Sequence, residues 1–254
     1  MAPPEIVSTA PFPPVPSRKE TGVLFMPDMS LAIREDRKTQ TRRRIAIPKR
    51  GAFVLRGDDE HADGGPWWPY QSDDGESDVC DDGCEHRMNC PYGQPGDLIW
   101  GREAFAAFGR WETRYSAEKG RDEWHFVDMT LETGRAYRYE RVQLPPRRSA
   151  LAKPTWHNRP SLFMPRVASR ITLEITAVRV ERLHDISEAD CRTEGCAPQA
   201  WCLEDSEGLI DWPLKDAAHP YRNGYALLWE QINCPGTWAA NPWVWAITFK
   251  RINP

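Results

Sequence analysis

A long stretch of alternating polar and apolar residues, 169–183, constrains the fold of this chain more than any other feature. Successive side chains of a β-strand point to opposite faces, so the alternation predicts a strand with one buried face. An isolated strand or hairpin is not stable in water, so this strand needs several neighbours. Shorter segments predict those neighbours at 23–25, 45–47, 53–55, 97–100, 125–127, 135–139 and 243–249. The sequence therefore predicts a sheet whose strands lie far apart along the chain.

Three segments carry the signals of helices. The first begins at about Asp28, where Asp28 or Ser30 can cap the first turn. The second covers 188–194, with Ser187 as the N-cap and a glycine after its last residue. The third covers 221–232, where apolar residues recur at helical spacing. Several strands, few helices and long excursions between them predict an α+β fold around a small β-barrel.

Composition divides the chain into a short arm and one domain. Residues 1–21 are rich in proline and predict a disordered arm, whereas 22–254 are expected to form a single domain. From 57 to 89 the composition changes to Asp, Gly, Pro, Ser and Trp without periodicity, which predicts an insertion loop. We expect a second insertion at about 106–158.

The balance of charge limits the class of protein. A net charge of −4 argues against a protein that coats nucleic acid by bulk electrostatics. The charge is uneven, because 58–85 are acidic whereas 34–56 and 135–170 are basic, so a local basic surface remains. The chain has no apolar run of membrane-spanning length, no secretory signal, and an odd number of cysteines, seven. These features predict a soluble cytoplasmic protein with reduced thiols and no membrane partner, and they leave the oligomeric state open.

Residues 37–44, Arg-Lys-Thr-Gln-Thr-Arg-Arg-Arg, place one lysine and two threonines inside a block of positive charge. Neighbouring guanidinium groups disfavour the protonated form of Lys38, so a pocket formed here could hold a neutral amine. A neutral amine can accept a proton from the hydroxyl of Thr41, three residues away. The alternative is that this basic run is the solvated end of the preceding helix, where its charge complements the helix dipole.

Five segments resemble, in kind and in order, segments of ASCH-domain proteins, a PUA-like family, and especially its phage and prophage members. They are residues 29–43, 90–103 with a Pro-Gly-Asp turn, 160–170, 183–195 and 241–251. The resemblance covers most of the chain from about Gly22 onward, with gaps. It implies a small β-barrel of PUA type with flanking helices and long insertion loops. It says less about function, because one fold hosts unrelated activities.

One ASCH branch hydrolyses N4-acetylcytidine, and its Lys-x-x-Thr-x-Arg loop is similar to Lys38, Thr41 and Arg43 in this chain. Glu194 falls on a glutamate of that branch when the segment after the long strand is aligned. The resemblance implies that Thr41 attacks the acyl carbonyl, that Lys38 takes its proton, and that Glu194 protonates the departing exocyclic amine. The implied activity is an amidohydrolase of a modified cytosine nucleoside or nucleotide, without a catalytic cofactor.

The chain departs from that branch in its length, because the known amidohydrolases are less than half as long. The insertions can narrow, cover or repurpose the pocket. The alternatives are a non-catalytic module that binds RNA or a modified base, with the basic run as an anion-binding loop, and a ribonuclease of the same class. Each interpretation uses four arginines as phosphate or base contacts: Arg43, Arg159, Arg166 and Arg170.

Four potential zinc ligands lie close together at the end of the first insertion: Cys80, Cys84, His86 and Cys90. Three cysteines and one histidine are a common closed set, and a structural zinc would hold a loop that has no core. Two observations favour the alternative of no metal. Only one residue separates Cys84 from His86, and Cys90 also belongs to a segment of the ASCH resemblance.

Several of the twelve tryptophans lie beside basic residues, as Trp156 does near Arg159. Aromatic rings beside arginines can stack on the bases of single-stranded nucleic acid. More often such rings pack loops onto a barrel, and we expect Trp243 and Trp245 in or near the core. His157 is notable because it neighbours the arginine-rich block.

Overall fold

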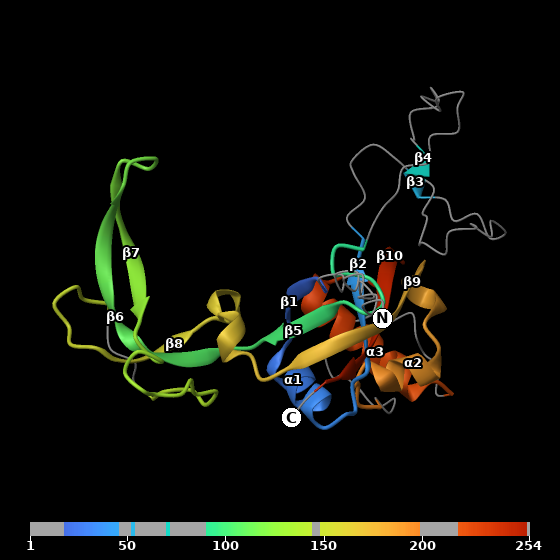
Figure 1. Ribbon diagram of the computed structural model, residues 1–254. Coiled ribbons are helices and arrows are strands. Elements are labelled where there is room, and N and C mark those ends of the chain that lie inside the picture. Colours follow the sequence, from blue (N-terminus) through green and yellow to red (C-terminus); the bar gives the residue numbers. More distant parts are fainter. Residues whose placement is uncertain are drawn as a thin grey trace, which may run out of the picture.

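The computed structural model describes residues 18–45, 90–143, 148–198 and 218–252, and the backbone of two short strands, Ala52–Phe53 (β3) and Tyr70–Gln71 (β4). These residues form a mixed α+β fold with a five-stranded sheet, a three-stranded sheet, the two-stranded pair of β3 and β4, and three α-helices (Figure 1). The predicted α+β class is confirmed. The expected proline-rich arm and most of the first insertion lie outside the described residues. Within the described part, no helix is long and apolar enough to cross a membrane.

The main sheet joins strands from the whole length of the described chain. Its order is β1-β5-β9-β10-β2, in which β1 and β5 run parallel and the other neighbours antiparallel. The strands are β1 (Glu20–Leu24), β2 (Gln40–Arg44), β5 (Leu98–Arg102), β9 (Thr172–Arg182) and β10 (Trp243–Arg251). The strand predicted from the long alternation is β9, and it occupies the middle of the sheet.

The apolar face of β9 and β10 forms the main core. Leu173 and Ile175 of β9 are fully buried together with Ile247 of β10 and Ile33 of the first helix. Burying one such side chain contributes roughly 1.5–3 kcal/mol to the free energy of folding. A shift of one residue would expose all these side chains, so the alternating pattern determines which face of the strand turns inward. Trp245, which the sequence places in or near the core, is buried in the same cluster.

The first helix, α1 (Pro27–Arg34), begins one residue before the predicted start. Met26 is the N-cap, and no side chain caps the turn, so the predicted capping by Asp28 or Ser30 is wrong. Pro27 explains the difference, because its fixed φ suits the first helical position and it has no backbone N–H to satisfy. Ser30 is buried inside the helix instead.

The other two helices follow the sequence prediction closely. In α2 (Glu188–Thr193), the Ser187 hydroxyl accepts a hydrogen bond from the Asp190 backbone N–H at 3.0 Å, as expected of an N-cap. Helix α3 (Pro220–Asn233) packs against α2 through a second core cluster that includes Leu183, Tyr225 and Trp229. A 3₁₀ turn, η3 (Leu183–Asp185), connects β9 to α2.

Residues 105–159 contain a second antiparallel sheet of order β7-β6-β8, which projects away from the main sheet as an arm (Figure 1). Its strands are β6 (Phe105–Ser116), β7 (Arg121–Asp128) and β8 (Thr155–Arg159). Two 3₁₀ turns, η1 (Ser161–Phe163) and η2 (Arg166–Ala168), lead back to β9. The predicted strand at 135–139 is wrong, because only Arg138 there forms a β-bridge, to Ala106.

The described strands do not close into a barrel, since β1 and β2 are the two edges of the main sheet. Helix α1 connects these edges, and one side chain bridges them. Arg43 Nη2 of β2 donates to the carbonyl oxygen of Leu24 in β1 at 2.7 Å.

Candidate functional site

The basic run forms a buried edge strand and not a solvated helix end. Strand β2 contains its last five residues and pairs with β10, where Thr41 lies opposite Ile247. Gln40, Thr41 and Arg42 are all buried. The alternative of a solvated basic end is therefore wrong for these three residues.

Backbone pairing brings Lys38 opposite Glu194, although 156 residues separate them. The N–H of Thr39 donates to the carbonyl of Thr193 at 2.8 Å, next to an antiparallel bridge between Lys38 and Glu194. Gly195 permits this close approach. Its φ is +78°, and an added Cβ would lie only 3.0 Å from the Cβ of Lys38. The position of Glu194 is thus set by the end of α2 and by the segment that enters β2.

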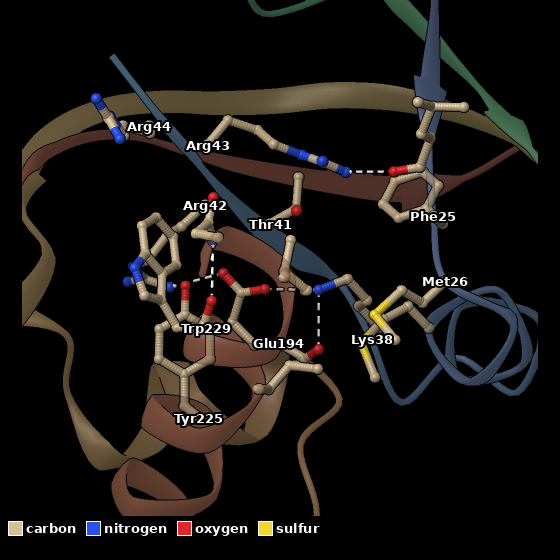
Figure 2. A pocket seen from close by; sticks show the side chains of 15 residues that line it. Phe25, Met26, Lys38, Thr41, Arg42, Arg43, Arg44, Glu194, Tyr225 and Trp229 are labelled. Atoms are coloured by element: carbon tan, nitrogen blue, oxygen red, sulfur yellow. Dashed lines mark hydrogen bonds and ion pairs between the residues drawn. The ribbon is translucent and has the colours of Figure 1, made fainter. Parts of the chain in front are cut away.

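The side chains of Lys38 and Glu194 form a buried ion pair (Figure 2). Lys38 Nζ donates to Glu194 Oε2 at 2.6 Å and to the Glu194 backbone carbonyl at 2.8 Å. Each side chain is only 3% exposed. Two hydrogen bonds to one residue hold the amine in a single orientation.

Arg42 holds the other oxygen of the same carboxylate. Its Nη1 donates to Glu194 Oε1 at 3.1 Å, while its Nε and Nη2 bind Glu181 and Asp190 at 2.6 and 3.1 Å. Burial opposes the charge of Arg42, but the attraction of the Glu194 and Glu181 carboxylates outweighs it and raises the pKa of the guanidinium. Arg42 is therefore a fixed cation that orients Glu194.

A cavity of about 90 Å³ opens beside this ion pair. Lys38, Thr41 and Glu194 all line it, and Figure 2 shows the Thr41 side chain between Arg43 and the Lys38–Glu194 pair. No hydrogen bond joins the Thr41 hydroxyl to any residue that the structure describes. The cavity thus presents a hydroxyl, an amine and a carboxylate within one partly open space.

Arg43 forms one wall of the cavity. Besides its bond to Leu24, its guanidinium lies 5.4 Å from the centre of the Phe25 ring. Burial lowers the pKa of Arg43, and its Nε has no hydrogen-bond partner among the described residues. The side chain therefore places a poorly compensated positive charge at the cavity, and its role as a substrate contact stays a prediction.

Helix α3 supplies the wall that faces the ion pair, and sequence analysis assigned no site role to its residues. Tyr225 and Trp229 line the cavity (Figure 2). Burial and the charge of Glu194 raise the pKa of Tyr225 well above its usual value, so its hydroxyl stays neutral. Their helical spacing shows that these rings face inward, but it carries no signal that they border a cavity.

Three of the predicted substrate contacts lie elsewhere. Arg159 stacks on rings of the arm, Arg166 pairs with Glu20 at 2.8 Å, and Arg170 pairs with Glu103 at 2.8 Å. None of these arginines lines the cavity beside Lys38.

Of the four predicted zinc ligands, Cys80, Cys84 and His86 lie outside the described residues. Cys90 is buried in the main core, where burial raises the pKa of its thiol. Hydrogen bonds from the backbone of Tyr92 and Gly93 act in the opposite direction. The zinc set stays a prediction.

Comparison with protein-family models found no match to this chain, and comparisons with curated proteins and with solved structures found no significant match.

Proposed function

We propose that this cavity is the active site of an amidohydrolase that removes an acyl group from the exocyclic amine of a modified cytosine nucleoside or nucleotide, such as N4-acetylcytidine. The observation that carries the proposal is the convergence of Lys38, Thr41 and Glu194 in one cavity. The proposal includes membership of the ASCH family and its PUA-like barrel, for which the sequence resemblance is the support.

The proposed reaction begins with a proton shift. Moving one proton along the 2.6 Å hydrogen bond from Lys38 Nζ to Glu194 Oε2 yields both a neutral amine and a protonated carboxyl group. The amine then takes the proton of Thr41 while the hydroxyl oxygen attacks the acyl carbonyl. Arg42 keeps the carboxyl group in place through its other oxygen.

The second half of the reaction releases the amine. Glu194 gives its proton to the exocyclic nitrogen as the C–N bond breaks, which leaves the acyl group as an ester on Thr41. Water then cleaves this ester, releases the carboxylic acid and restores the hydroxyl. All proton transfers use side chains of the cavity, so the scheme needs no cofactor.

The size of the cavity limits what can enter. At about 90 Å³ it is smaller than the roughly 150 Å³ apolar cavity that holds benzene in an engineered protein. An acyl group and the edge of a base can enter, whereas a sugar would remain at the mouth. This selects for a small acyl group on a projecting amine.

The test is to incubate the protein with N4-acetylcytidine or its deoxy form and to measure the release of cytidine or deoxycytidine by chromatography. We expect hydrolysis by the wild-type protein and at least a hundredfold loss in Thr41→Ala and Lys38→Met. Thr113→Ala and Lys250→Ala are matched controls, because both residues are exposed and lie outside the cavity. Hydrolysis that persists in both cavity variants would refute the assigned roles.

A second candidate function is recognition of a modified base without catalysis. The observation in its favour is the ion pair itself, because Lys38 already donates to two oxygens of Glu194 and an ammonium cannot act as a base. Calorimetry with N4-acetylcytidine separates the two functions. Tight binding without turnover, abolished in Arg43→Ala, would favour recognition.

We also retain the structural zinc of Cys80, Cys84, His86 and Cys90 as a proposal. Elemental analysis should find one zinc per chain, and Cys84→Ser should lose it. Catalysis in the scheme above is independent of this metal.

A further inference from the structure

One face of the arm carries a stack of aromatic rings and arginines. We call it the Trp111 face, formed by Trp111, Phe126, Arg148, Arg159 and Phe163. Trp111 of β6 lies opposite Phe126 of β7, and their rings meet edge to face at 5.3 Å. The guanidinium carbon of Arg159 lies 4.5 Å from the Phe126 ring centre and 4.7 Å from that of Phe163. The guanidinium carbon of Arg148 lies 4.5 Å from the centre of the Trp111 ring.

The arginines of this face differ in their partners from several arginines elsewhere in the described structure. Arg42, Arg170 and Arg251 each form ion pairs with carboxylates. Neither Arg148 nor Arg159 pairs with any carboxylate in the described part of the chain. Burial and repulsion from Arg148 lower the pKa of Arg159, and the charge of Asp128 offsets this only in part, so the two positive charges lie close together and are incompletely compensated. Ring stacking holds these guanidinium groups and leaves their hydrogen-bond donors available.

The surroundings strengthen this charge. The segment 105–159, which contains the arm, has eleven arginines and lysines against seven aspartates and glutamates. The protein as a whole is negative, so the arm concentrates positive charge against the overall balance. Phe163 is 57% exposed and Leu162 is 60% exposed, so two large apolar side chains are accessible to a ligand beside this charge.

We propose that the Trp111 face binds single-stranded nucleic acid. Free guanidinium donors match phosphate oxygens, and an exposed ring such as Phe163 offers a platform on which a base can stack. An acidic protein segment would use the charge of this face but would have no need of the exposed ring. This face shares no residue with the lining of the Lys38 cavity, so binding here does not depend on the chemistry proposed there.

The experiment is fluorescence anisotropy with a labelled 20-nucleotide single strand, as RNA and as DNA of the same sequence, at several salt concentrations. Phe163→Ala should weaken binding about fivefold or more, because one stacked base is lost. Arg148→Ala should weaken binding to all sequences and make the slope of log K against log salt less negative by about 0.7. Arg114→Ala is the matched control, since Arg114 lies on the same strand but pairs with Glu112.

Every outcome of this experiment decides the proposal. Reduced binding in Phe163→Ala and Arg148→Ala, with Arg114→Ala unchanged, supports it, and the two probes show whether RNA or DNA is preferred. Wild-type binding in both variants, with a native circular dichroism spectrum, overturns it, as does no binding by the wild-type protein at 50 mM salt. Competition by polyglutamate as strong as that by unlabelled nucleic acid assigns the face to an acidic protein partner instead. Because binding is measured and not hydrolysis, failure of the amidohydrolase proposal leaves this test intact.

Discussion

Replacing Glu194 by glutamine should destabilise the protein strongly. The substitution keeps the size of the side chain but removes the negative charge that faces Lys38 at 2.6 Å and Arg42 at 3.1 Å. Removing one partner of a buried ion pair costs about 3–5 kcal/mol, because the remaining charge stays desolvated. For a domain of this size each kcal/mol lowers Tm by about 2–4 °C, so Tm should fall by roughly 6–20 °C.

Lys38→Met should cost less than Glu194→Gln, about 1–3 kcal/mol, because Glu194 keeps its bond to Arg42. In the double variant both charges of the pair are gone. Its loss should be smaller than the sum of the single losses by about 0.5–3 kcal/mol, the range for side chains in direct contact. Urea unfolding followed by circular dichroism measures all four free energies.

The exposed pair of Glu35 and Arg37 provides the control. Glu35→Gln should leave the free energy of unfolding almost unchanged, since exposed ion pairs contribute little. Two results would refute the reasoning about the buried pair. One is wild-type stability in Glu194→Gln, and the other is a double variant whose loss equals the sum of the single losses.

Three further predictions follow from other described residues. Gly195→Ala should cost about 1–2 kcal/mol or more, because its φ of +78° disfavours a side chain and the new Cβ would press on Lys38; thermal unfolding measures this, and an unchanged Tm would contradict it. Burial and a neighbouring arginine lower the pKa of His157 below its usual 6.5, so the unfolded chain binds more protons than the folded protein as the pH falls. The contribution of His157 to the free energy of unfolding is therefore fully present above pH 6.5 and is lost at lower pH. His157→Phe should flatten that part of the profile of unfolding free energy against pH. Iodoacetamide should modify the exposed Cys234 in the native protein long before Cys191, whose burial raises the pKa of its thiol, and mass spectrometry of timed samples would show the reverse order if this were wrong.

Local sequence patterns predicted those helices and strands in which the order of polar and apolar residues matches the burial of the side chains. The sequence of β9 alternates between polar and apolar residues, and α2 has a capping serine and a terminal glycine. The hydrophobic period and the capping residues were therefore sufficient to predict these two elements. β6 was missed because charged residues continue along both faces beyond Gly109, where the arm is exposed. The segment 135–139 has the residue types of a strand, but Arg138 bridges only Ala106 and the pairing does not continue.

The candidate site was predicted in part. Lys38 and Thr41 stand out in the basic run, Glu194 came from the resemblance to ASCH proteins, and the structure brings these three together. The burial of Arg42 could not be predicted, because a block of arginines is expected to be solvated unless its carboxylate partners are known. Those partners, such as Glu181, lie more than a hundred residues away in the sequence.

The position of β10 in the main sheet has a consequence for how the protein is made. Among the described strands β2 pairs only with β10, and Arg44 and Val244 are partners across 200 residues of sequence. At a synthesis rate of about 5–20 residues per second, the basic strand waits roughly 10–40 s on the ribosome before its partner exists. Glu194, which neutralises Lys38, also arrives late. We therefore expect the cavity to form in a single late step of folding, so that nascent chains ending before β10 have no partly assembled site.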